Sequence, residues 1–204
     1  MKLLYSDENI AVCIKPVGLD SEMGLPEALK ELLGGEIFTV HRLDLNVGGV
    51  MVYARNRKTA AELSQAIQAG TMIKEYVAMV HGQPPESGDW TDLLWKDSQK
   101  NKVFVVKRER KGVKLARLKF TRLREGEESL VHIRLYTGRS HQIRVQFASR
   151  GFPLVGDRKY GARDLVFTPM LFSCRLTFPL GGKAHRFEAL PDWAGGDICT
   201  DCTI

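Results

Sequence analysis

The stretch VKLARLKFTRLREGEESLVHIRLYT, residues 113–137, decides the fold class of this chain. Apolar and polar residues alternate through most of both halves, which is the pattern of β-strands with one buried face. The segment Glu125–Glu128, with a glycine in second place, supplies a tight turn between the halves. The stretch therefore predicts an antiparallel hairpin, and VFVVKR just before it (103–108) predicts another strand.

Outside this stretch the pattern changes between strand and helix without a regular repeat. Further strands are predicted within 3–15, 47–56, 72–81, 170–178 and 184–190. Helices are predicted over 26–33, 58–69 and 140–150, with Ser140 as the cap of the last one. Many antiparallel strands with a few helices predict an α+β fold.

Composition indicates a single soluble domain. The chain has 204 residues, 44% of them hydrophobic and 26% charged, which is enough for one well-buried core and argues against disorder. No apolar run approaches a membrane span of roughly 18 residues, and the charged start is unlike a signal peptide. We expect a non-secreted, cytoplasmic protein that does not associate with membranes.

The cysteines predict neither a metal site nor a redox site. Only Cys199 and Cys202 form a C-x-x-C pair, and no second pair completes a zinc module. Cys13 and Cys174 stand alone in the sequence. We expect reduced thiols without a role in chemistry, as is usual in the cytoplasm.

Positive charge is concentrated in one third of the chain. Residues 100–163 hold 18 Lys/Arg and five Asp/Glu, whereas the rest of the chain is net acidic. A basic region of this kind usually contacts a polyanion, most often nucleic acid, although a solvated basic face without a partner has the same composition.

Two short runs remain as candidates for chemistry after common motifs are excluded. The chain has no phosphate-binding loop, no dinucleotide fingerprint and no G-x-S-x-G elbow. It does have HRLD at 41–44 and TGRSHQIR at 137–144. A carboxylate beside arginines stays ionised and can act as a nucleophile or a general base. Arg139 could pair with a carboxylate or a phosphate in two-point fashion. The alternative is that Asp44 and one arginine form a salt bridge that only holds a turn.

Several longer motifs, in a fixed order, carry a resemblance to a known family. They are HRLDLNVGGVMVYARN (41–56), KEYVAMVHG (74–82), LYTGRSHQIRVQFASRGFPLVGDRKYG (135–161) and LFSCRLTFPLGGKAHRFEALP (171–191). Together with LLYSDENIAVCIKPVGLDSE (3–22), they resemble the RluA-type family of RNA pseudouridine synthases over nearly the whole chain.

This resemblance implies a fold, a reaction and a substrate class. It implies one pseudouridine-synthase catalytic domain over 1–204, without a separate N-terminal RNA-binding domain. The domain would have a mixed, mostly antiparallel sheet, flanking helices and a central RNA-binding cleft. It also implies isomerisation of specific uridines in structured rRNA or tRNA by base flipping, without a cofactor or a metal, and we expect a monomer.

The same resemblance assigns roles to four residues. The motif aspartate is Asp44, which attacks the target nucleoside at ring carbon 6 or at the anomeric carbon. Tyr76 stacks on the flipped uracil, Arg139 pairs with Asp44, and Arg42 inserts into the RNA where the base leaves. The chain departs from the family pattern next to the nucleophile, where Leu45 and Val47 replace polar residues.

Other residues of these motifs predict structure rather than chemistry. His41, His132, His141 and His185 lack a partner pattern for acid–base work and are predicted to be hydrogen-bonded structural residues. The dipeptide KP at 15–16 is interpreted as scaffold at the end of a hairpin.

Two other functions remain open from sequence alone. The first is a non-catalytic RNA-binding factor on the same fold that assists ribosome or tRNA folding. The presence of Asp44, Tyr76 and Arg139 argues against it, because a protein that had lost its activity could lose any of them. The second, a DNA-acting glycosylase, is disfavoured by the resemblance.

Overall fold

The computed structural model describes residues 1–195, and its described chain forms two compact units. The first unit comprises Met1–Lys74 and Phe172–Pro191, and the second comprises Glu75–Leu171 and the described residues from Asp192 onward. The pair Cys199 and Cys202 lies outside the described residues. None of the described helices is long and apolar enough to cross a membrane.

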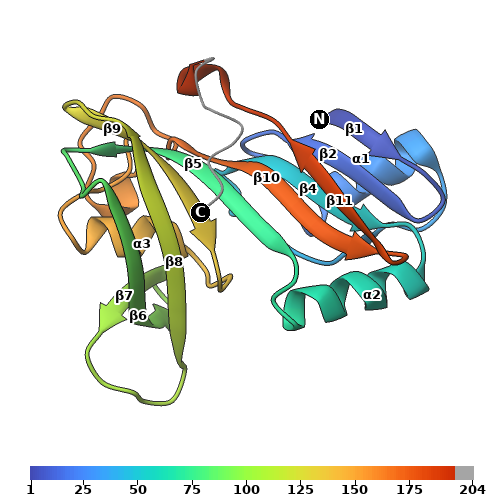
Figure 1. Ribbon diagram of the computed structural model, residues 1–204, viewed down its shortest axis with the longest axis horizontal. Helices are drawn as coiled ribbons and strands as arrows, with labels where there is room; N and C mark the ends of the chain where they lie inside the picture. Colours follow the sequence, from blue (N-terminus) through green and yellow to red (C-terminus); the bar gives the residue numbers. More distant parts are fainter. Residues whose placement is uncertain (196–204) are drawn as a thin grey trace. The chain divides into compact units, whose positions relative to one another are not determined.

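The first unit is a layered arrangement of strands and two helices (Figure 1). Its strands follow the spatial order β1-β2-β4-β10, and β3 and β11 pair with β4 and β10, respectively. The β4–β10 pairing is parallel, and the other pairings within this unit are antiparallel. The elements are β1 (Lys2–Ser6), β2 (Ile10–Lys15), α1 (Gly24–Leu33), β3 (Phe38–Thr39), β4 (Gly48–Ala54), α2 (Arg57–Gln68), β10 (Leu171–Leu180) and β11 (Lys183–Glu188).

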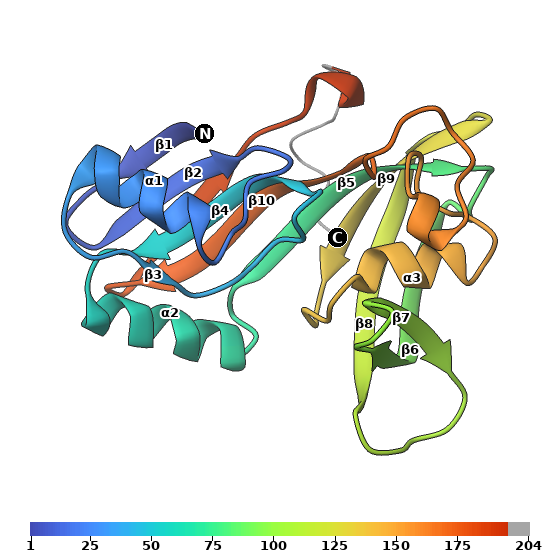
Figure 2. The ribbon, with the colours of Figure 1, turned by 180° about the vertical axis from the view of Figure 1, so that it is seen from behind.

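The core of the first unit follows from its apolar strands. Every residue of β4 is buried, as are five of the six residues of β2. The helix α2 lies alongside β3 and β4 (Figure 2) and contributes Leu63 to a core that also contains Leu176 and Phe178. Asn56 caps α2 by accepting a hydrogen bond from the Thr59 backbone N–H.

The second unit is built on a hairpin of long strands, and its elements follow the order β5-β9-β8-β6-β7. The pairings of β8 with β9, β6 with β8, and β6 with β7 are antiparallel. The short helix α3 lies against β6 and β7 (Figure 2). The elements are β5 (Ile73–His81), β6 (Ser87–Asp97), β7 (Lys102–Val106), β8 (Val113–Arg124), β9 (Glu128–Leu135), α3 (Gln142–Ala148), and the 3-10 turns at Arg158–Tyr160 and Asp192–Ala194.

An aromatic cluster and an aliphatic cluster hold the second unit together. The rings of Trp90, Phe120 and Phe147 join β6, β8 and α3, with centroids 4.4–5.2 Å apart. Leu94 and Val145 belong to a separate apolar cluster between β6 and α3. These contacts fix α3 on the strands, because closely packed aromatic pairs are stabilised beyond their burial alone.

The predicted α+β class with a mostly antiparallel mixed sheet is confirmed, with two corrections. The strand β6 was not predicted, and the third helix is shorter than the predicted 140–150. Ser140 does not cap this helix. The N-cap position is His141, which has a left-handed backbone (φ 51°) and makes no side-chain cap hydrogen bond. The expectations of one catalytic domain and of a central cleft stay predictions.

Candidate active site

Asp44 lies in the loop that leads into β4, and the backbone on both sides of it is fixed. The Leu43 carbonyl accepts a hydrogen bond from the Ser21 hydroxyl at 3.0 Å, and the Leu45 carbonyl accepts one from the Gly18 N–H at 2.9 Å. The Asp44 carbonyl closes a turn by accepting from the Val47 N–H at 3.0 Å. Leu43 is buried, whereas Asp44 is partly exposed. A carboxylate on such a loop is accessible and has a fixed starting point.

A buried lysine forms hydrogen bonds with the same loop. Lys15, at the end of β2, is fully buried, and its Nζ donates to the Pro16 carbonyl at 2.9 Å and to the Leu45 carbonyl at 3.1 Å. Burial lowers the pKa of Lys15 to about 8, while the carboxylates of Asp20 and Asp44 act in the opposite direction. At neutral pH Lys15 is therefore mainly a cation, and it is hydrogen-bonded to the loop that carries Asp44.

Lys15 is a residue whose part in the site was missed from sequence. The dipeptide at 15–16 was interpreted as scaffold, yet its lysine binds the loop that carries Asp44. A signal was present, because a lysine that ends the apolar run IAVCI needs polar partners once it is buried.

Arg42 faces away from the core and forms an ion pair on the surface. Its Nη1 lies 2.7 Å from Oε2 of Glu22, and both side chains are largely exposed. Asp20 binds the backbone N–H groups of Glu22 and Met23 at 2.8 Å. These two hydrogen bonds hold the pKa of Asp20 below its usual value, and the positive charge of Arg42 adds to the effect. Arg42 thus precedes Asp44 by two residues, and its exposed ion pair with Glu22 can be replaced by contacts with water or with a phosphate.

The histidines of the motifs have structural partners, as predicted for three of them. His41 Nε2 accepts from the Val52 N–H at 3.2 Å. His132 Nε2 lies 3.4 Å from the Glu75 carboxylate. His141 Nδ1 lies 2.9 Å from the Tyr160 hydroxyl. The ring of His185 stacks on Phe178 instead of making a side-chain hydrogen bond within the described chain.

Tyr76 and Arg139 belong to the second unit. Tyr76 is on β5 and is 6% exposed. Arg139 is exposed, its Nε donates to the Leu115 carbonyl at 2.9 Å, and its backbone N–H donates to Oε1 of Gln142 at 3.0 Å. Arg42 and Asp44 belong to the first unit. The pairing of Asp44 with Arg139 stays a prediction.

The buried arginine of the run 137–144 is Arg144 rather than Arg139. Its guanidinium binds the Asp157 carboxylate through two hydrogen bonds of 2.7 and 2.8 Å, and both side chains are almost fully buried. Such a two-point pair costs desolvation but is rigid, because the fork of the guanidinium matches the carboxylate. Arg144 therefore ties α3 to the segment that contains Asp157, a role not foreseen from sequence.

One group of side chains in the second unit has the composition of a metal site. The ligand atoms of His81, Glu128 and Asp164 lie within 4.8 Å of one another. His81 Nε2 is 2.9 Å from the Asp164 carboxylate, which also accepts from the Gly156 N–H at 2.6 Å. Asp164 is thus already bound by the Gly156 N–H and the His81 ring, and the geometry is explained as a hydrogen-bonded pair that holds a loop.

Comparisons with known proteins agree with this description. A family model described as RNA pseudouridylate synthase matches residues 10–149. The chain is 31% identical to the dual-specificity RNA pseudouridine synthase RluA of Salmonella typhimurium, over 94% of this chain and 93% of that protein. It is 30% identical to the ribosomal large subunit pseudouridine synthase D of Borreliella burgdorferi, over 90% of this chain and 63% of that protein.

A solved structure shares the fold. Human RNA pseudouridylate synthase domain containing 1 superposes with a TM-score of 0.81 at 21% identity, over 93% of this chain and 83% of that one.

Proposed function

Because the chain belongs to the RNA pseudouridine synthase family and isomerises uridine to pseudouridine in RNA, we propose that Asp44 is its catalytic carboxylate. The observation that carries the proposal is the loop of Asp44. Hydrogen bonds to the carbonyls of Leu43 and Leu45 fix its backbone, and one of these bonds comes from the buried Lys15 ammonium. A pre-positioned, ionised carboxylate is what a nucleophilic step requires.

The reaction exchanges one carbon–nitrogen bond for one carbon–carbon bond. The bond between N1 of uracil and C1′ of the ribose breaks, the base turns, and C5 bonds to C1′. C5 then loses its proton and N1 gains one, so the atoms of the nucleoside are conserved. Asp44 attacks either C6 of the base or C1′ of the sugar. In both cases its bond to the nucleoside is broken again before the product leaves.

Residues of the first unit prepare Asp44 for this step. Lys15 stays charged near neutral pH and holds the loop through its two hydrogen bonds to the Pro16 and Leu45 carbonyls. Arg42 exchanges its exposed contact with Glu22 for the RNA when the uridine leaves the stack. Base flipping costs a few kcal/mol, and contacts made by such a side chain offset part of that cost.

Residues of the second unit bind the RNA. Tyr76 stacks on the uracil through its ring, and Arg139 pairs with Asp44. The basic residues of 100–163 contact phosphates of a structured rRNA or tRNA. The name of one relative, a ribosomal large subunit enzyme, supports rRNA as a substrate class. The protein acts in the cytoplasm as a monomer and needs neither a cofactor nor a metal.

No observation favours the alternative of a non-catalytic RNA-binding factor. Asp44, Tyr76 and Arg139 are all present, and the loop of Asp44 is hydrogen-bonded on both sides. A protein that only bound RNA would not need this arrangement.

The test maps pseudouridine in total RNA from cells that lack the gene. The RNA is incubated with the wild-type protein or with Asp44→Ala and read by carbodiimide-stop primer extension. A stop that arises only with the wild-type protein supports the proposal and identifies the modified uridine. Equal stops with both proteins would exclude Asp44 from the chemistry. Intact RNA binding without any new stop would favour the binding factor.

A further inference from the structure

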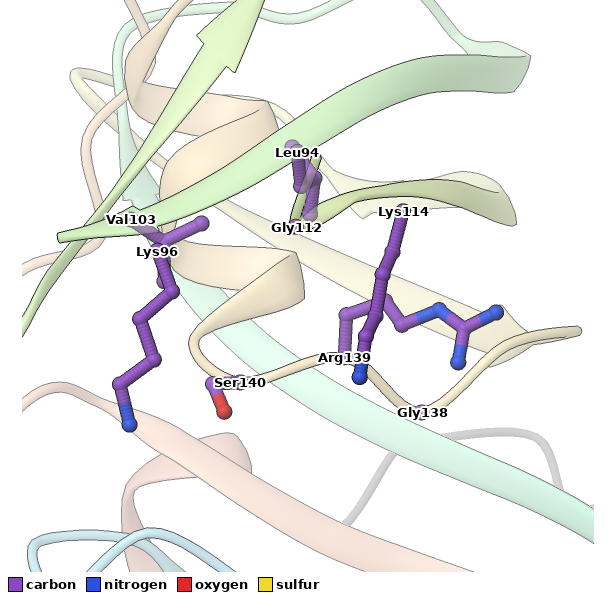
Figure 3. Close-up of a pocket in the computed structure, with 8 residues that line it drawn as sticks. All are labelled: Leu94, Lys96, Val103, Gly112, Lys114, Gly138, Arg139 and Ser140. Carbon is purple, nitrogen blue, oxygen red and sulfur yellow. The ribbon is translucent and has the colours of Figure 1, made fainter. Parts of the chain in front are cut away.

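A hollow in the second unit concentrates positive charge. It encloses about 160 Å³ and is lined by residues of β6, β7 and β8 and by the segment 138–140. Its polar side chains are Lys96, Lys114, Arg139 and Ser140 (Figure 3). In this view the two lysine side chains extend in the same direction, and Ser140 is drawn between their amines.

The apolar side chains that line the hollow are packed in the core of the second unit. Leu94 and Val103, which line it, are 3% and 2% exposed and belong to the apolar cluster under α3. Leu94 is the strand partner of Lys114, and Val103 is that of Lys96, so the sheet register places both lysines at the hollow. The hydrogen bond from Nε to the Leu115 carbonyl anchors the Arg139 guanidinium.

The two lysines of the hollow differ from neighbouring cations of the same unit, because neither lysine has an acidic partner there. On the same strands, Arg117 and Lys119 both lie within 4.0 Å of the Asp89 carboxylate. Within the described part of the second unit, by contrast, no carboxylate oxygen lies within 4.0 Å of Lys96 or Lys114. Three cations around one hollow repel one another, and a bound anion would relieve that repulsion.

The size of the hollow indicates which anion fits. Sites for whole small molecules usually enclose about 300–1,000 Å³, so a hollow of 160 Å³ suits one group of a larger ligand. A phosphate accepts hydrogen bonds from ammonium, guanidinium and hydroxyl donors alike, and the apolar floor can contact the carbon atoms of an adjoining ribose.

We propose that this hollow is a subsite for one backbone phosphate of the substrate RNA. The inference rests on the proposed function for the identity of the ligand. Lys96 and Lys114 supply charge on flexible side chains, and Ser140 supplies a hydroxyl donor between them. The subsite thereby fixes the position of the RNA strand on the second unit without reading a base.

The test measures RNA affinity and its salt dependence, without turnover. The probe is fluorescently labelled total tRNA, and a transcript of large-subunit rRNA serves as a second probe. The variant K96Q/K114Q removes two charges from the hollow. The control K30Q/K58Q removes two charges from exposed positions on α1 and α2. Thermal melting of both variants verifies that they are folded.

We expect K96Q/K114Q to weaken binding about tenfold and to lower the slope of log Kd against log salt concentration by about 1, which corresponds to one lost phosphate contact. The control should keep the wild-type slope. Equal slopes in K96Q/K114Q and the control, for both probes, would overturn the proposal.

A competition experiment separates the RNA backbone from a free anion as the source of the phosphate. Inorganic phosphate is added to about 10 mM at constant ionic strength. This addition should leave the affinity of the wild-type protein for RNA unchanged. Displacement of the RNA by that concentration would assign the hollow to a free anion and overturn the proposal. Because affinity is read directly, this result is independent of whether the protein forms pseudouridine.

Discussion

His41, the first residue of the HRLD motif, acts as a hydrogen-bond acceptor for the sheet. Its Nε2 accepts from the backbone N–H of Val52, so the ring must be neutral at that nitrogen. Burial lowers the pKa of His41 to about 3, and the positive charge of Lys74 adds to the effect. The residue therefore contributes to stability only while it is unprotonated.

This contribution predicts a loss of stability in acid. In the unfolded chain His41 has a pKa of 6.5 and takes up a proton as the pH falls below that value, whereas the folded protein resists protonation down to about pH 3. The free energy of unfolding should therefore fall between pH 6.5 and 3, by about 1 kcal/mol at pH 5 after allowance for partial exposure.

Urea unfolding at pH 7 and pH 5 measures this effect. His41→Gln retains an acceptor but has no titrating group, so its stability should fall less than that of the wild-type protein over this interval. Equal losses in the two proteins would contradict the assignment of His41 as a neutral acceptor.

At the scale of the element, the loop of Asp44 depends on the end of β2. Lys15→Met removes the Nζ contacts to the Pro16 and Leu45 carbonyls. The two carbonyls then lose their donor, which costs about 1–3 kcal/mol of stability. We therefore expect a melting temperature lowered by several degrees, with the protein still folded at about 25 °C, and pseudouridine formation at least about tenfold slower, because the position of Asp44 is no longer held.

Lys15→Arg is the second variant. It retains the positive charge, but its guanidinium does not have the size and shape of the ammonium that binds the Pro16 and Leu45 carbonyls. Hydrogen exchange of the Gly18 amide, which also binds Leu45, reports on the loop directly. Faster exchange in Lys15→Met, together with slower turnover, supports a positioning role. A wild-type rate in Lys15→Met would contradict it.

The start of β4 requires glycine at one position. Gly49 has a φ of +130°, and a Cβ atom there would lie 2.4 Å from the Ser173 nitrogen and 2.5 Å from its oxygen on β10. Gly49→Ala should therefore destabilise the protein by about 3 kcal/mol or more, through backbone strain and displacement of β10.

Gly48→Ala is the matched control for this prediction. Its Cβ would meet the Lys15 carbonyl oxygen at 3.2 Å, and its φ lies outside the left-handed region. Denaturant unfolding should rank Gly49→Ala well below Gly48→Ala in stability. The reverse order would contradict the account of the β4–β10 contact.

The elements that sequence predicts best are those in which local pattern and packing agree. The hairpin of β8 and β9, the helix α2 and the buried strand β4 are predicted to within a few residues. The strand β6 was missed because Asp89, Asp92 and Gly88 interrupt its apolar pattern. Two of these are balanced by distant partners, Arg117 for Asp89 and Arg150 for Asp92.

The residues of the candidate site also fall into those that the sequence predicts and those that it does not. Asp44, Arg42, Tyr76 and Arg139 come from sequence motifs. The partners of Lys15 and the charge-rich hollow depend on strand register and loop hydrogen bonds, which no local pattern contains. The wrong cap assignment at Ser140 has the same origin, because Gln142, rather than Ser140, binds the backbone at the start of α3.

At the scale of the whole molecule, charge is the property that most affects binding. The basic third of the chain, 100–163, lies entirely within the second unit. RNA affinity should therefore fall by at least about tenfold between 50 and 200 mM salt, on the order expected when several phosphate contacts release counterions. Fluorescence anisotropy with total tRNA measures this dependence, and a flat response would contradict a phosphate-binding role for the basic region.

If Asp44 carries out the isomerisation, the release of tritium from C5 of uridine should depend on its carboxylate. The substrate is rRNA and tRNA labelled with tritium at C5 of uridine, since this hydrogen is lost when C5 bonds to the ribose. The wild-type protein should release tritium to water, and Asp44→Asn should release none while it melts at the wild-type temperature and binds RNA with similar affinity. Release by Asp44→Asn at the wild-type rate would contradict the claim.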